Sequence, residues 1–219
     1  MILQAGASEP GRELAARTAD VIFTLQTDSA ESRAFREDIR KRAVRFGRDP
    51  DKIKVLPGIT PIVGKTDQDA VDFRDRMKNL IPEDLAITHL MPHSGGINFR
   101  DYDLNGPMPE LPETNNGKSH RAAIMALARR GLSILETART FAEGSYMKMV
   151  GSPTTIADTM QEWLEADACD GFLAVPTHFP AGVEDFTTLV IPELQRRGIF
   201  RKDYSGKNFR ENLGVETYT

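Results

Sequence analysis

The 219-residue sequence predicts an α/β fold in which parallel strands alternate with helices. Short apolar segments are followed by segments whose apolar residues recur at helical spacing, and this pattern occurs four times. The helical segments begin at capping residues, and the apolar segments are nearly continuous, as is typical of strands buried on both faces. Periodicity alone leaves two architectures open, an open doubly wound sheet and part of a (β/α)8 barrel.

The strand and helix positions follow from these signals. Strands are expected at residues 1–3, 21–23, 53–63 and 171–175, with an interruption of the third at Pro57-Gly58. Helices are expected at 10–20, 28–47, 66–80, 119–130, 134–142, from 152 onward, and at 184–197. Their starts carry capping residues at Asp28, Thr66, Ser133 and Ser152. Pro192 lies inside the last helix and should kink it.

Helical spacing also predicts which side chains are buried. The helix after Asp28 should bury Phe35, Ile39, Ala43 and Phe46. The helix after Thr66 should bury Ala70, Phe73, Met77 and Leu80. Trp163 lies on the core stripe of the helix that begins at Ser152, which predicts a packing role.

Residues 81–119 break the regular alternation. This segment is rich in proline, glycine and asparagine, and a structureless loop of this length is uncommon within a compact domain. We therefore expect one domain over residues 1–219, with an insertion at 81–119 that has local structure of its own.

Composition excludes several classes of protein. The net charge of −4 and the pI near 5.6 give no reason to expect binding to nucleic acid or to an anionic membrane. No segment has the roughly 20 mainly apolar residues of a transmembrane helix. The start of the sequence shows no export signal, so we expect a cytoplasmic protein. The single cysteine, Cys169, excludes an intrachain disulfide and a metal site built from cysteines.

A candidate anion-binding site lies where the first strand meets the first helix. Free backbone N–H groups and the positive end of a helix dipole attract anions at such a corner. Glycines here permit close backbone approach, the Ser8 hydroxyl can donate to a phosphate oxygen, and Arg12 can add a charge. The alternative is a strand-to-helix turn that Ser8 caps and that binds nothing. The candidate binding residues are Gln4, Ala5, Gly6, Ser8, Glu9, Gly11 and Arg12.

Other chemistry-bearing residues give weaker signals. His89 and His93 have metal-ligand spacing, but Pro92 separates them, so we expect no metal site. His178 follows the strand at 171–175, where active-site groups lie in barrels, although an exposed loop histidine has the same pattern. Cys169 has no basic neighbour and should be a buried structural thiol. The arginine-rich stretch 33–48 is interleaved with acids and should form a solvated face.

The sequence resembles the C-terminal half of the flavin-dependent monooxygenases of the bacterial luciferase-like superfamily. The branch it resembles contains nitrilotriacetate and dibenzothiophene-sulfone monooxygenases. The stretches that carry the resemblance are Gln4–Ala16, Leu111–Asn115, Val150–Pro153 with Glu162-Trp163, and Cys169–Phe172 with Pro192–Gly198. The tail Phe200–Gly214 has the same character, so the likeness covers essentially the whole chain.

The resemblance implies a fold and a function. It implies that the four β/α units form the C-terminal half of a TIM (β/α)8 barrel, with the insertion after the third unit acting as a lid. It implies reduced FMN, supplied by a separate flavin reductase, and O2 as the oxidant of a small organic substrate. The corner Gln4–Arg12 would hold the FMN phosphate, and His178 and Phe179 would border the flavin or substrate pocket. The catalytic residues remain unassigned.

The sequence also departs from the family. We expect no counterpart in this sequence of the first four strands of the family's barrel, and Ser145-Tyr146-Met147 stands where the family often has a Gly-His pair. A half barrel has two open sheet edges, so we expect a homo-oligomer or association with a missing N-terminal half. Two alternatives remain open: a catalytically inactive half barrel, and an unrelated β/α enzyme that binds a phosphate.

Overall fold

The computed structural model describes residues 1–112, 118–144 and 146–215. The chain divides into two compact units. Unit 1 consists of Met1–Val71 with Tyr146–Thr219, and unit 2 consists of Asp72–Ser145. The predicted insertion 81–119 lies within unit 2, and residues 113–117 of it lie outside the described part of the chain.

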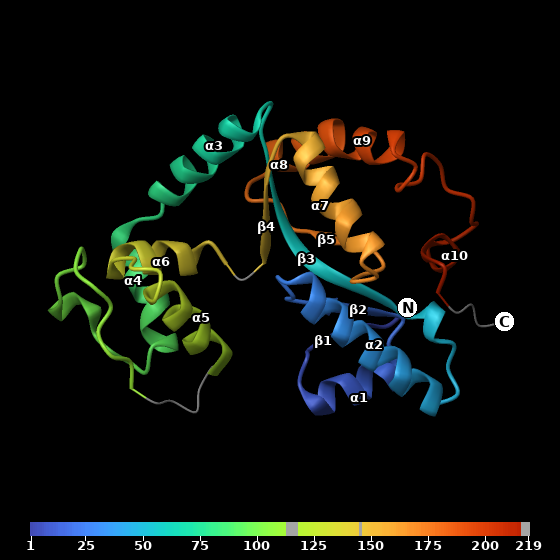
Figure 1. Ribbon diagram of the computed structural model, residues 1–219, viewed down its shortest axis with the longest axis horizontal. Coiled ribbons are helices and arrows are strands. Elements are labelled where there is room, and N and C mark those ends of the chain that lie inside the picture. Colours follow the sequence, from blue (N-terminus) through green and yellow to red (C-terminus); the bar gives the residue numbers. More distant parts are fainter. Residues whose placement is uncertain (113–117, 145, 216–219) are drawn as a thin grey trace. The chain divides into compact units, whose positions relative to one another are not determined.

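Unit 1 is built on a parallel sheet (Figure 1). Its strands are β1 Leu3–Ala5, β2 Val21–Thr24, β3 Lys54–Val63, β4 Met147–Gly151 and β5 Leu173–Ala174. The order is β1-β2-β3-β4, and β5 also pairs with β3. Ile59 of β3 is paired with Met147 on β4 and with Ala174 on β5, so these two strands lie on opposite edges of β3. The predicted α/β fold with a parallel sheet is confirmed.

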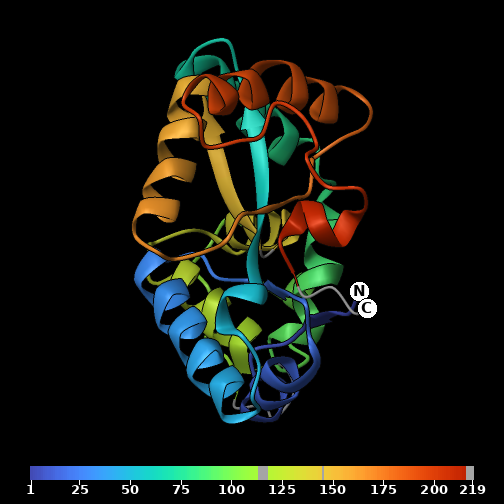
Figure 2. The ribbon, with the colours of Figure 1, turned by 90° about the vertical axis from the view of Figure 1, so that its right-hand side faces the viewer.

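The prediction of four strands is wrong, because it omits β4. The segment Met147–Gly151 contains a lysine and two methionines and has little intrinsic strand preference. Its extended conformation comes from pairing with residues 59–63 of β3, a contact that no local pattern encodes. Figure 2 shows β3 and β4 side by side, with helix α7 (Pro153–Glu165) next to them.

The predicted interruption of the third strand is also wrong. β3 runs through Pro57-Gly58 without a break. Proline has no N–H to donate, but Pro57 is paired with Thr24 at the last position of the β2–β3 ladder, where a missing donor costs least. The first strand, Leu3–Ala5, is shifted relative to the predicted 1–3. The last strand, Leu173–Ala174, is shorter than the predicted 171–175.

Helices α1 and α2 pack on β2 and β3. α1 spans Glu9–Thr18 and α2 spans Ser29–Arg45. A short 3-10 turn at Pro50–Lys52 follows α2 and leads into β3. Asp28 caps α2 as predicted, with its carboxylate accepting the N–H of Glu31 at 2.9 Å. The core of this part is formed by Ala15, Ala19, Ile22, Phe35, Ile39, Ala43, Ile53 and Val55.

Helices α7 and α9 cover the other part of the sheet. Ser152 caps α7 as predicted, and Trp163 of α7 is buried. The predicted helix 184–197 is instead α8 Ala181–Asp185, a π-helical stretch Phe186–Val190 and α9 Ile191–Arg196. Pro192 cannot donate the hydrogen bond of a regular α-helix, and the π-helical stretch ends at Val190, two residues before it. The C-terminal segment ends in the short helix α10, Phe209–Leu213.

Two side chains predicted to be buried are exposed. Phe46 is 38% exposed and Leu80 is 73% exposed. Both lie beyond the helix to which the sequence pattern assigned them, since α2 ends at Arg45 and α3 (Asp67–Asn79) ends at Asn79. Phe46 and Leu80 are therefore exposed because the helices end before these residues, whereas the sequence pattern continues to them.

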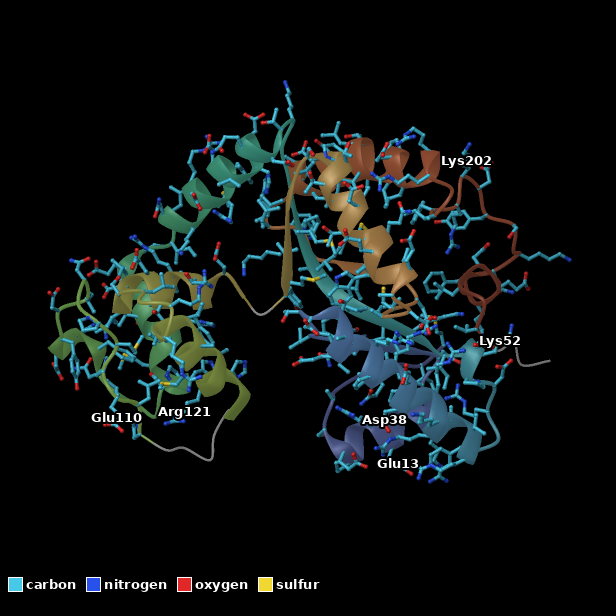
Figure 3. All side chains as sticks on the ribbon, in the orientation of Figure 1. Glu13, Asp38, Lys52, Glu110, Arg121 and Lys202 are labelled. Atoms are coloured by element: carbon cyan, nitrogen blue, oxygen red, sulfur yellow. The ribbon has the colours of Figure 1, made fainter. Side chains whose placement is uncertain are left out.

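Unit 2 has a separate core. It contains the end of α3, α4 Glu83–Leu90, two 3-10 turns at Met91–His93 and Phe99–Asp101, α5 Lys118–Ala128 and α6 Ile134–Ala142. Ser133 and Glu136 form the predicted capping box at the start of α6. Arg121 of α5, labelled in Figure 3, donates to the carbonyl oxygens of Leu111 and Pro112 and fixes the proline-rich loop. In the described part of the chain, no helix is long and apolar enough to cross a membrane.

The carboxylate of Asp20 connects the start of β2 with the C-terminal segment. Asp20 is 1% exposed and accepts the N–H of Ile2 at 2.7 Å and both terminal nitrogens of Arg210 at 2.9 and 2.8 Å. Burial alone would raise the pKa of this carboxyl, but the hydrogen bonds from Arg210 and Ile2 hold the pKa below its usual value.

This lowered pKa predicts an acid-dependent loss of stability. A carboxyl whose folded pKa is depressed stabilises the fold above its unfolded pKa of about 4, and this stability is lost as the pH falls through the folded pKa. The stability difference between the wild type and Asp20→Asn should therefore be largest near neutral pH and shrink below about pH 4. Urea unfolding at a series of pH values measures it. A constant difference from pH 7 to pH 3 would contradict the prediction, and Asp84→Asn, at an exposed pair, is the control.

Candidate functional site

The predicted corner between strand and helix is present in unit 1. β1 ends at Ala5, Gly6 adopts a φ of 133°, and Ser8 is the N-cap of α1. Few side chains could adopt the backbone conformation of Gly6 without strain. The residues from Ala5 to Glu9 are exposed, so the end of the helix is open to solvent.

The backbone donors at the start of α1 are only partly used. The Ser8 Oγ accepts the N–H of Gly11 at 3.3 Å, and the Ser8 carbonyl accepts the N–H of Arg12 at 2.8 Å. Pro10 has no N–H. The N–H of Glu9 is left without an acceptor among the described residues, at the positive end of a ten-residue helix. The Ser8 hydroxyl accepts one bond and can still donate its own proton.

Two further features of this corner are its close backbone packing and an unpaired acceptor. A Cβ atom at Gly11 would lie 3.0 Å from Ser8 Oγ and 3.3 Å from the Gly6 carbonyl oxygen, so the corner is tight at this position. The side-chain carbonyl oxygen of Gln4 is buried and has no hydrogen-bond partner within the part of the chain that the structure describes, while its amide nitrogen donates to the Ala5 carbonyl at 2.9 Å. An unpaired buried acceptor of this kind is unfavourable unless a ligand or water supplies a donor.

The charged side chains of Arg12 and Glu9 are both engaged with neighbouring residues of the chain. Arg12 donates to the Ala7 carbonyl at 2.9 Å and to Asp38 at 3.1 Å, and its guanidinium lies 4.9 Å from the centre of the Phe35 ring. The Glu9 carboxylate pairs with Arg42 at 2.7 and 3.0 Å. The predicted extra charge of Arg12 is therefore used to hold the corner against α2.

The residues of α2 that support the corner were not predicted from the sequence. Arg42 pairs with Asp38 at 2.9 Å and with Glu13 at 2.8 Å, and Figure 3 labels Glu13 and Asp38, which come from α1 and α2. Burial raises the pKa of the Asp38 carboxyl, but hydrogen bonds from Arg42 and Arg12 outweigh this effect and lower the pKa. The Arg42 hydrogen bonds also lower the pKa of Glu9. The spacing of Asp38 and Arg42, four residues apart on a helix, was a usable signal for this pair.

His178 and Phe179 follow the C-terminal end of β5, as the corner follows the C-terminal end of β1. Because the strands are parallel, both loops belong to the same end of the sheet, although β2 and β3 separate β1 from β5 in the sheet order. Phe179 is 76% exposed. The His178 Nδ1 lies 2.9 Å from the Thr177 hydroxyl.

Three histidines of unit 2 are close together, which their sequence positions did not suggest. The ring centres of His93 and His120 are 4.5 Å apart, those of His89 and His93 are 5.8 Å apart, and all three rings contact Phe141. Burial and the two neighbouring imidazoles lower the pKa of His93. Among the residues that the structure describes, no group of three His, Cys, Asp or Glu side chains is arranged to hold a metal ion.

Cys169 is the buried thiol that the sequence predicted. It is 4% exposed, and burial raises the pKa of its thiol to about 12. A thiol with this pKa is not ionised at neutral pH and is unsuited to nucleophilic catalysis.

Comparison with known proteins identifies related sequences. The family model described as luciferase-like monooxygenase matches residues 2–170. The chain is 40% identical to nitrilotriacetate monooxygenase component A of Aminobacter aminovorans over 98% of its own length and 48% of that protein. It is also 40% identical to N-acetyl-S-(2-succino)cysteine monooxygenase of Bacillus subtilis, over 99% of its length and 50% of that protein. The chain thus spans about half the length of the curated relatives it matches.

Solved structures similar to this chain also match it over nearly its whole length and over less than half of their own length. The structure of DmoA from Hyphomicrobium sulfonivorans superposes with a TM-score of 0.79 at 28% identity, over 96% of this chain and 44% of that one. A riboflavin lyase (RcaE) solved with modified FMN and riboflavin superposes with a TM-score of 0.75 at 28% identity, over 98% of this chain and 47% of that one. These matches exclude the alternative of an unrelated phosphate-binding β/α enzyme.

Proposed function

Because the chain belongs to the luciferase-like monooxygenase family, we propose that it is the C-terminal half of a two-component FMN-dependent monooxygenase. The complete enzyme would oxygenate a small organic substrate with O2 and with reduced FMN that a separate flavin reductase supplies. Its relatives include monooxygenases named for nitrilotriacetate and dibenzothiophene sulfone, and their diversity leaves the substrate open.

The single observation that carries this proposal is the corner at the start of α1. The residues there fit a phosphate group: the Glu9 N–H without an acceptor, the Ser8 hydroxyl and the tight backbone at Gly6 and Gly11. The unpaired side-chain oxygen of Gln4 could accept a hydrogen bond from a hydroxyl of the same ligand. The Gly11 N–H already bonds to the Ser8 Oγ.

The flavin supplies the oxygen chemistry when it is bound, and the chain supplies binding and orientation. Ser8 and the Glu9 amide would hold the phosphate. Arg12 would act as a positioning residue, because its bond to the Ala7 carbonyl fixes the turn just before Ser8. His178 and Phe179 would border the flavin or substrate at the same end of the sheet.

The sheet itself supports the view that a second half completes the barrel. β1 pairs with β2 alone and β5 pairs with β3 alone among the described strands, so each leaves one edge open. Met1, Ile2 and Leu3 at the β1 edge are each about half exposed. An N-terminal half of the same family, or a second copy of this chain, would cover these edges. A catalytically inactive half barrel is the second candidate, because the present strands form only part of a barrel.

Titration with FMN and with riboflavin tests the phosphate site directly. The chain should bind FMN weakly and riboflavin more weakly still, because riboflavin has no phosphate. Ser8→Ala should lower the FMN affinity roughly tenfold, as expected for the loss of one charge-assisted hydrogen bond. The fluorescence of free flavin measures the binding.

The control is Thr18→Ala, which removes a hydroxyl from the opposite end of α1, where it bonds to Leu14. This variant should bind FMN like the wild type. Equal affinities for FMN and riboflavin, or an unchanged FMN affinity in Ser8→Ala, would contradict the proposed site. Oxygenation of a substrate by the isolated chain with reduced FMN would exclude the inactive alternative.

A further inference from the structure

Unit 1 contains a cavity of about 330 Å³ that does not involve the corner at α1. It lies next to β5 and is bordered by α7, α9 and the C-terminal segment. Its size falls in the range of small-molecule sites. Most of its lining is apolar, and Leu56, Leu164, Phe172, Ala174, Phe200 and Leu213 are among the contributing residues.

The two charged residues of the lining differ in how they are paired. The Asp170 carboxylate is fully engaged, with Arg36 at 2.8 and 3.0 Å and the Val55 N–H at 2.9 Å. Arg201 donates from one terminal nitrogen to the Asn212 carbonyl at 2.7 Å, and its guanidinium lies 5.7 Å from the Tyr204 ring. Among the described residues, no carboxylate forms an ion pair with Arg201. An exposed arginine therefore contributes to the lining of an apolar cavity, and no acid of the described chain forms an ion pair with it.

We propose that this cavity binds an aliphatic carboxylate. The alkyl chain would occupy the apolar space and the carboxylate would bind the remaining N–H groups of Arg201. A small inorganic anion would leave the apolar space unfilled, and an uncharged hydrocarbon would make no use of the N–H groups of Arg201. An aliphatic carboxylate uses both the apolar space and the arginine. This inference is independent of whether the corner at α1 binds FMN.

The chain offers its own reporter for this site. Trp163 is the single tryptophan of the sequence, and its ring centre lies 6.1 Å from that of Phe172, which lines the cavity. Titration with hexanoate, octanoate and decanoate below their micelle concentrations should change the Trp163 fluorescence. The affinity should rise roughly tenfold for each two added methylenes until the cavity is full. Octanol should bind more weakly than octanoate.

Variants of the charged group separate a specific site from general hydrophobic binding. Arg201→Gln should lower the octanoate affinity roughly tenfold and leave the octanol affinity unchanged. Arg201→Lys should retain most of the octanoate affinity. Lys202→Gln is the matched control, since it removes the same charge from the neighbouring exposed residue (Figure 3) and should have no effect.

A variant of the apolar wall tests the location. Ala174→Phe should fill the cavity and abolish binding of both octanoate and octanol, with an unchanged melting temperature as evidence of folding. No binding of any of the acids at millimolar concentration, an affinity that does not depend on chain length, or equal losses in Arg201→Gln and Lys202→Gln would each overturn the proposal. Because Arg201 is exposed, its variants remain informative if Ala174→Phe does not fold.

Discussion

Replacing Arg36 with alanine is expected to lower the free energy of unfolding of unit 1 by about 3 kcal/mol. The guanidinium of Arg36 is bidentate to Asp170 and also bonds to Asp167, and its side chain is only 9% exposed. These hydrogen bonds, that with Asp170 foremost, raise the pKa of Arg36. Without Arg36 the Asp170 carboxylate, which is 12% exposed, keeps the Val55 N–H as its one hydrogen-bond partner among the described residues.

Urea unfolding of Arg36→Ala and the wild type measures this difference. The control is Arg33→Ala, which removes an exposed arginine one turn earlier on the same helix, where it pairs with Glu37. Its loss should be less than about 0.5 kcal/mol. Equal losses in the two variants would show that burial of the Arg36–Asp170 pair does not matter.

Phe35→Ala is the second change with a large expected effect, a loss of about 4 kcal/mol. Phe35 is 2% exposed and packs with Ile22, Ile39 and Val55 between α2 and the sheet. Truncation to alanine removes the apolar contacts and leaves a cavity that the surrounding strands and helices cannot fully close. The same ring supports the Arg12 guanidinium, so the corner at α1 should also lose order.

Calorimetry or urea unfolding measures the loss in Phe35→Ala. Val44→Ala on the same helix is the control, because Val44 is 60% exposed and its truncation should change stability by no more than about 0.5 kcal/mol. FMN titration of Phe35→Ala below its unfolding transition tests the link to the corner. A stability loss below 1 kcal/mol would mean that Phe35 is not part of the core as described.

Local signals in the sequence predicted the features that depend on neighbouring residues. Ser8, Asp28, Ser133 and Ser152 all cap the helices to which they were assigned, because a cap needs only a backbone N–H two or three residues away. The strand-to-helix corner could be predicted for the same reason. The residue types there and the resemblance to a family also favour an anion site, which stays a prediction.

Features that depend on distant contacts could not be predicted from local patterns. β4 is a strand because of its pairing with β3, and the division into two units depends on which core each helix joins. Arg36 and Asp170 are 134 residues apart, so no local spacing links them. The use of Arg12 as a support and not as a free charge also depends on Asp38, from another helix.

The position of β3 in the sheet has a consequence for the order in which unit 1 can be assembled. β3 pairs with β2, β4 and β5, but β4 and β5 follow it only after the whole of unit 2. During synthesis on the ribosome, one edge and part of the other edge of β3 therefore remain unpaired while unit 2 is translated. Such edges favour association with other chains, so nascent protein at this stage should be a substrate for chaperones that bind extended apolar segments.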